Sequence, residues 1–133
     1  MVNPSTADAV TDDATIRRVV GFGIRFGWSK VIVVNVFAYR ATDVRVLAQV
    51  PDPIGPDNAQ HLRLILDEAE VALVAWGSLS KLPLALRDEW RNVSAIAGAA
   101  GKQLKCLGVA NDGHPRHPLM LSYQSKVADW RVP

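Results

Sequence analysis

The stretch KVIVVNVF, residues 30–37, decides the fold of this chain. Its residues are β-branched and apolar at successive positions, so both faces of an extended segment would be apolar. A strand of this kind is buried on both sides, as in a parallel sheet. Two further apolar runs, at residues 71–76 and 104–109, have the same character. The sequence therefore predicts three strands.

Helical patterns alternate with these strands. Apolar residues recur at helical spacing over residues 13–26, 57–70 and 82–100, and residues 43–49 fit a short helix. Alternating helices and strands favour right-handed crossovers and helices on both faces of the sheet. We expect an α/β fold, namely a three-layer α/β/α domain with a small parallel sheet, formed by residues 1–133. We also expect Trp130 to dock the weakly patterned C-terminal tail.

The length, charge and cysteine content of the sequence limit its domain organisation, its partners and its expected location. A chain of 133 residues is long enough for one hydrophobic core, and its net charge of +2 does not by itself indicate a polyanionic partner. Cys106 is the single cysteine, so an intrachain disulfide is excluded. No apolar run approaches the roughly 20 residues that cross a bilayer, and we expect no signal peptide. We expect a cytoplasmic protein without a membrane partner.

Several common chemistries lack their motifs. The sequence has no GxxxxGK[ST] phosphate-binding loop and no GxSxG nucleophile elbow. His114 and His117 are three residues apart in a proline-rich loop, with no carboxylate nearby that completes a metal site. We therefore expect no cofactor and no metal.

Polar and aromatic residues gather after the predicted strands. In an open α/β sheet, ligands bind at the carboxyl ends of the strands. The residues expected at this edge, if Met1-Val2 end a further strand, are Asn3, Pro4, Ser5, Asn35, Phe37, Tyr39, Arg40, Trp76, His114, Arg116 and His117. Their convergence predicts one ligand pocket.

Each of these residues also has a purely structural interpretation. Asn3-Pro4-Ser5 has the composition of an ordinary turn. Trp76 is a common type of core residue, Arg40 is a common surface ion-pair partner, and a loop histidine is usually solvated. The prediction of a pocket depends on the whole set rather than on any single member.

The chain resembles the bacterial family of unknown function numbered 1643 over nearly its whole length. The segments that carry the resemblance are MVNPSTAD at residues 1–8, DD at 12–13 with TIRR at 15–18, VNVFAYRAT at 34–42, AWG at 75–77 and GHPRHPL at 113–119. This family implies no established activity.

More distantly, the layout is similar to the uracil-DNA glycosylase superfamily. That resemblance implies a parallel sheet whose first strand is followed by a loop like Asn3-Pro4. It implies that Asn3 positions the attacking water, that Asn35 reads the edge of a base, and that either His114 or His117 stabilises charge on the departing base. The fixed donor and the base-reading amide suit this chemistry, and a base in DNA would be flipped into the pocket.

The resemblance also implies a partner and an expectation about the first strand. We expect a nucleobase, a nucleotide or DNA as partner, with Arg40 or Arg116 on a phosphate. The alternatives are a non-catalytic nucleotide- or nucleic-acid-binding module, and a remnant without function. Since relatives have a full strand before Asn-Pro-Ser, we expect an N-terminal strand truncated to Met1-Val2.

Overall fold

The computed structural model describes residues 1–4 and 13–133. Its three α-helices are α1 (Ala14–Phe26), α2 (Asn58–Glu68) and α3 (Trp90–Ala99). Its three short strands are β1 (Ala72–Leu73), β2 (Leu104–Cys106) and β3 (Ala128–Asp129). Four 3-10 helices complete the described part: η1 (Val44–Gln49), η2 (Leu79–Lys81), η3 (Leu84–Leu86) and η4 (Pro118–Met120).

The sheet is small, open and mixed, in the order β1-β2-β3. β1 and β2 are parallel, with Ala72 opposite Leu104, as the α/β pattern predicts. β2 and β3 are antiparallel, with Cys106 opposite Ala128, so the prediction of an all-parallel sheet is wrong. The third strand comes from the C-terminal tail, which returns directly to the sheet without a crossover helix.

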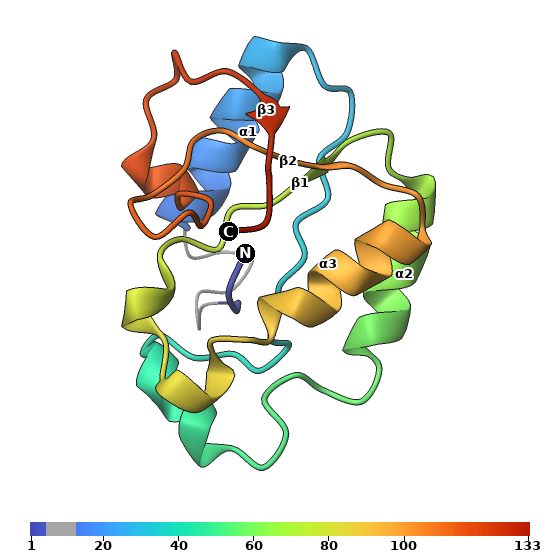
Figure 1. Ribbon diagram of the computed structural model, residues 1–133. Helices are drawn as coiled ribbons and strands as arrows, with labels where there is room; N and C mark the ends of the chain where they lie inside the picture. The colour runs from blue at the N-terminus through green and yellow to red at the C-terminus, as the bar shows by residue number, and fades with distance from the viewer. Residues whose placement is uncertain (5–12) are drawn as a thin grey trace.

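Helices pack on both faces of this sheet. Ala72, Val74, Leu104 and Cys106 belong to the larger buried cluster, which includes side chains of α2 and α3. Leu73 and Leu107 instead contact the smaller cluster around Phe22 of α1. Because successive strand residues face opposite sides, α1 lies on one face and the α2–α3 pair on the other. In Figure 1 the strands cross the molecule between these two groups of helices.

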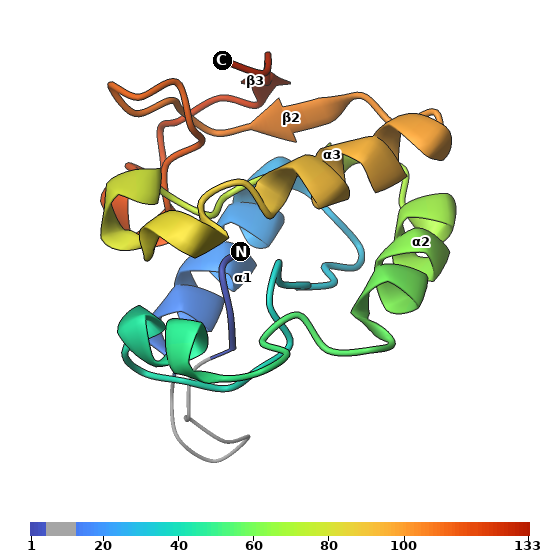
Figure 2. The same cartoon turned by 60° about the horizontal axis from the view of Figure 1, so that its bottom comes forward.

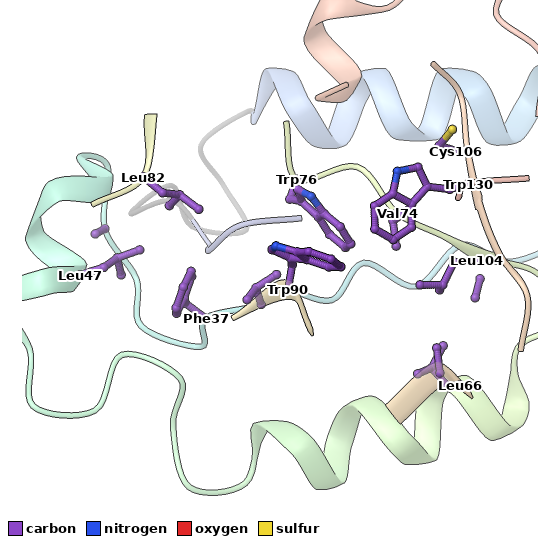
Figure 3. Close-up of a cluster of buried hydrophobic side chains, with 14 residues drawn as sticks. Phe37, Leu47, Leu66, Val74, Trp76, Leu82, Trp90, Leu104, Cys106 and Trp130 are labelled. Carbon is purple, nitrogen blue, oxygen red and sulfur yellow. The ribbon is translucent and has the colours of Figure 1, made fainter. Parts of the chain in front are cut away.

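Aromatic rings fill the centre of the larger cluster. The ring centroids of Trp76, Trp90 and Trp130 lie 5.2–6.2 Å apart, and all three side chains are buried. Figure 3 shows the three indoles grouped between Phe37 on one side and Leu104 on the other. The indole N–H of Trp130 donates to the carbonyl of Gly113 at 3.1 Å. This confirms the prediction that Trp130 docks the tail.

Residues 30–36 were the strongest predicted strand, but the described structure assigns no strand to them. The segment has no assigned secondary structure over residues 30–35, and only its end pairs with the backbone of the first two residues. The Met1 amino group donates to the Val34 carbonyl at 2.8 Å, and the Val36 N–H donates to the Met1 carbonyl at 2.9 Å. These two bonds follow the pattern of parallel strands. The paired stretch is too short to form a strand along the whole segment.

The helix predictions were more accurate. α1 starts where Asp13 accepts from the Thr15 N–H, and it ends at Gly27 in the left-handed conformation. α2 and η1 lie where helices were predicted. The helix predicted over residues 82–100 is divided instead into η3 and α3. No described helix is long and apolar enough to cross a membrane.

Candidate functional site

The first four residues of the chain are partly buried, close to the predicted pocket edge. The termini overlap in Figure 1 but are separated in Figure 2, where the N-terminus lies between α1, α3 and the central segments. Burial lowers the pKa of the Met1 amino group to about 5. Val2 packs in the larger cluster and lines a cavity of about 10 Å³ together with Phe37 and Trp76. Such a volume is roughly that of one water, so it cannot hold a base.

Asn3 and Pro4 fasten the start of the chain to the segment after residue 37. The Asn3 side-chain amide donates to the Ala41 carbonyl at 2.7 Å and to the Pro4 carbonyl at 3.0 Å. The Pro4 carbonyl in turn accepts from the Ala41 N–H at 3.1 Å. These bonds use the amide N–H groups, so the Asn3 side-chain oxygen has the role of an acceptor. Ser5 lies outside the described residues.

Asn35 carries a buried polar atom without a partner. Its side-chain oxygen Oδ1 has no hydrogen bond within residues 1–4 and 13–133. The backbone around it is held by Asn58, whose side-chain amide donates to the carbonyls of Asn35 at 3.2 Å and Val36 at 2.8 Å. A buried acceptor left without a donor costs roughly 1–3 kcal/mol. The position is therefore suited to a ligand that brings an N–H or O–H group.

His117 lies half-buried beside the N-terminus. It caps η4, where its Nδ1 accepts from the Leu119 N–H at 3.3 Å, and the described residues give Nε2 no hydrogen-bond partner. Burial lowers the pKa of His117, positive charge at Met1 and Lys81 lowers it further, and Asp13 opposes them. Because the Met1 amino group has a pKa of about 5, its contribution applies only where it is charged, at acidic pH. A Cβ added at Gly77 would lie 3.4 Å from the His117 Cβ, which shows how closely the loop after β1 approaches this side chain.

His114 lies in a different environment. It is buried against Trp90 and Trp130, and its Nδ1 accepts from the Trp76 indole N–H at 3.4 Å. Burial lowers the pKa of His114, and the Asp112 carboxylate opposes that shift. Of the two candidate histidines, His114 is thus packed among core tryptophans and His117 lies near Met1.

The remaining predicted site residues divide between core and surface. Phe37 and Trp76 are buried in the larger cluster. Tyr39, Arg40 and Arg116 are exposed, and the Arg116 guanidinium donates to the Val109 carbonyl at 3.1 Å. The structure thus brings Asn3, Asn35 and His117 to the region of Met1, whereas Phe37 and Trp76 contribute to packing and Tyr39 lies on the surface.

Two anchoring residues were missed from the sequence. Arg18 donates from its guanidinium to the carbonyls of Pro118 and Leu121, and its charged group lies 4.2 Å from the centroid of the Tyr123 ring. These contacts hold η4, and with it His117, against α1. No local signal could have shown this, because the carbonyl partners are about a hundred residues away.

Asp112 is the second anchoring residue. Its carboxylate accepts from the Ser78 hydroxyl and from the N–H groups of Leu79 and His114. Burial acts to raise the pKa of Asp112, but these hydrogen bonds together outweigh it and lower the pKa. The sequence around Asp112 predicts a turn, and aspartate in a turn often accepts hydrogen bonds from backbone N–H groups, which could have indicated this role. Asp112 therefore joins the loops that follow β1 and β2.

The described residues include no group of three or more histidine, cysteine, aspartate or glutamate side chains that could hold a metal. What the edge does offer is one amide acceptor at Asn3, one at Asn35 and one imidazole at His117. These groups can position water, accept a hydrogen bond from a ligand and exchange a proton.

Comparison with known proteins identifies the family alone. No curated protein and no solved structure matches the chain. The family model described as "Protein of unknown function (DUF1643)" matches residues 1–119, which is most of the 133-residue chain. The chain belongs to this DUF1643 family of proteins of unknown function.

Proposed function

We propose that this chain recognises a nucleobase or nucleotide at the edge formed by Asn3, Asn35 and His117. The observation that carries the proposal is the buried Asn35 Oδ1 atom without a partner among the described residues. A base edge with an N–H group would satisfy this acceptor, and an amide selects bases by their pattern of donors and acceptors.

The proposed chemistry is hydrolysis of an N-glycosidic bond. Asn3 accepts a hydrogen bond from water through its side-chain oxygen and orients that water toward the sugar carbon. The bond from this carbon to the base nitrogen breaks, its electron pair leaves with the base, water supplies the hydroxyl group to the carbon, and the proton that water loses ends on the departing base. His117 stabilises, through Nε2, the negative charge that develops on the departing base.

The position of Met1 supports the grouping of these residues. Its amino group bonds to the carbonyl of Val34, next to Asn35, and it is near enough to His117 to lower the pKa of that histidine. The histidine pKa is also lowered by burial, which favours a neutral imidazole at pH 7.

The test is release of base under single-turnover conditions from nucleotides, nucleosides and short uracil-containing DNA. We expect Asn3→Ala and His117→Ala each to lower the rate of release by roughly a hundredfold or more, the usual scale for one acid-base group. His61→Ala is the matched control, because His61 is an exposed histidine on α2. If both site variants release base at the unchanged rate, the assigned roles are wrong.

The alternative is a non-catalytic nucleotide- or nucleic-acid-binding module. It is favoured by the hydrogen bonds of Asn3, whose side-chain amide donates to the backbone carbonyls of Pro4 and Ala41 and so has a structural use without catalysis. A thermal-shift screen with the same ligands separates the two. A ligand at a hundred times its dissociation constant adds about 2.7 kcal/mol of stability. Binding without base release supports the alternative, and neither binding nor release refutes both.

A further inference from the structure

A second, larger cavity lies between α2 and α3, apart from the Asn3–His117 edge. Its volume is about 250 Å³. Both ribbon views show these two helices side by side (Figures 1 and 2). The apolar walls are formed mainly by Val36, Ile54, Leu62, Val93 and Ile96. An engineered apolar cavity of ~150 Å³ binds benzene, so this cavity has room for one aromatic ring with a polar head.

The polar side chains of this cavity present acceptors. They are Asn58, Glu89 and Asn92. Asn58 uses both N–H groups on the carbonyls of Asn35 and Val36, which leaves its Oδ1 atom as an acceptor. Glu89 accepts from the Asn92 side-chain amide at 2.8 Å, and it forms no ion pair within the described part of the chain. A ligand head must therefore donate hydrogen bonds.

The charge at this end favours a cation. α2 and α3 both begin beside the cavity, and helix N-termini attract negative charge. The Glu89 carboxylate, at the cap position of α3, already supplies that charge. It would repel an anionic ligand and attract a cationic one, with a charge-assisted hydrogen bond in addition.

We infer that the α2–α3 cavity binds a small aromatic cation, in which an apolar ring packs on the helices and a donor-rich head reaches Glu89 and Asn58. This inference does not rest on the proposed nucleobase function: Asn3 and His117 do not line the cavity, and Asn58, which does, touches the other region only through the backbone carbonyls of Asn35 and Val36.

Benzamidine is the probe, since its amidinium head has only donors and a positive charge. Benzoate has the same ring with an anionic head and serves as the ligand control. Binding is measured by isothermal titration calorimetry and by NMR chemical-shift changes. We expect saturable benzamidine binding with shifts at Leu62, Val93 and Ile96, and no benzoate binding.

Two variants locate the binding site. Ala59→Phe fills the cavity from an exposed rim position, and Glu89→Gln removes the charge at similar size. We expect either change to weaken benzamidine binding by roughly tenfold or more. Ala99→Phe, at an exposed position of α3 outside the cavity, should leave the affinity unchanged. Circular dichroism verifies that each variant is folded.

Three outcomes would overturn the inference: no benzamidine binding, equal binding of benzoate, or an affinity unaffected by Ala59→Phe. A fourth is dimerisation through this surface, seen as a dimer in light scattering that Ala59→Phe converts to monomer. That result would assign the cavity to an interface between copies of the chain. None of these outcomes bears on base release, so the nucleobase proposal succeeds or fails separately.

Discussion

Replacement of Gly21 by alanine tests how η4 is held against α1. Gly21 lies within α1, and a Cβ added there would lie 2.3 Å from the Tyr123 hydroxyl oxygen and 2.7 Å from two ring carbons. The Tyr123 ring cannot simply rotate into solvent, because it packs edge-on against Phe22 and lies beneath the Arg18 guanidinium. Gly21→Ala should therefore displace Tyr123 and loosen the bonds from Arg18 to η4.

The magnitude follows from two opposing terms. Alanine in a helix interior is more stable than glycine by roughly 0.5–1 kcal/mol. Overpacking of a closely packed position costs roughly 1–3 kcal/mol. We therefore expect Gly21→Ala to lower the free energy of unfolding by about 1–2 kcal/mol. Gly98→Ala in α3 is the matched control, because a Cβ at Gly98 meets no atom within 4 Å. It should raise stability by up to ~1 kcal/mol.

Urea denaturation followed by far-UV circular dichroism measures both variants. Tyr123→Leu removes the clashing atoms, so the cost of Gly21→Ala should become smaller in that background, and the double-mutant cycle should show coupling. If Gly21→Ala is as stable as the parent chain, or Gly98→Ala is equally destabilising, the account of this contact is refuted.

Two further predictions concern the loops around the site. Because folding lowers the pKa of His114 and His117 below the ordinary value of 6.5, the unfolded chain binds more protons near that pH. The free energy of unfolding should fall as the pH drops through 6.5, as measured by urea melts at a series of pH values. In His114→Phe this dependence on pH should be weaker, because only His117 then contributes to it. Trp130→Phe leaves the partly buried Gly113 carbonyl without its indole donor and should cost about 1–3 kcal/mol, seen as a lower urea midpoint with an unchanged slope.

The sequence determined the helices more accurately than the strands. Asp13 and Gly27 mark the ends of α1 by capping, which is local chemistry, and the start of α2 after Pro56-Asp57 is equally local. Residues 30–36 read as the strongest strand, yet a strand exists only where a neighbouring backbone pairs with it. Pairing partners are remote in sequence, so the lack of an assigned strand over residues 30–36, within the part of the chain that the structure describes, could not be predicted.

The same division applies to the candidate site. The apolar pattern and the polar residues after each run predicted that Asn3, Asn35 and His117 would gather near one edge, since parallel strands carry their following loops to the same side. The two histidines were indistinguishable in the sequence, because both lie in one proline-rich loop. Only the tertiary structure separated them, by burying His114 among three tryptophans and leaving His117 beside Met1. Local hydrogen bonds and periodicity depend on residues that are neighbours in the sequence, whereas burial and remote contacts depend on how distant segments pack.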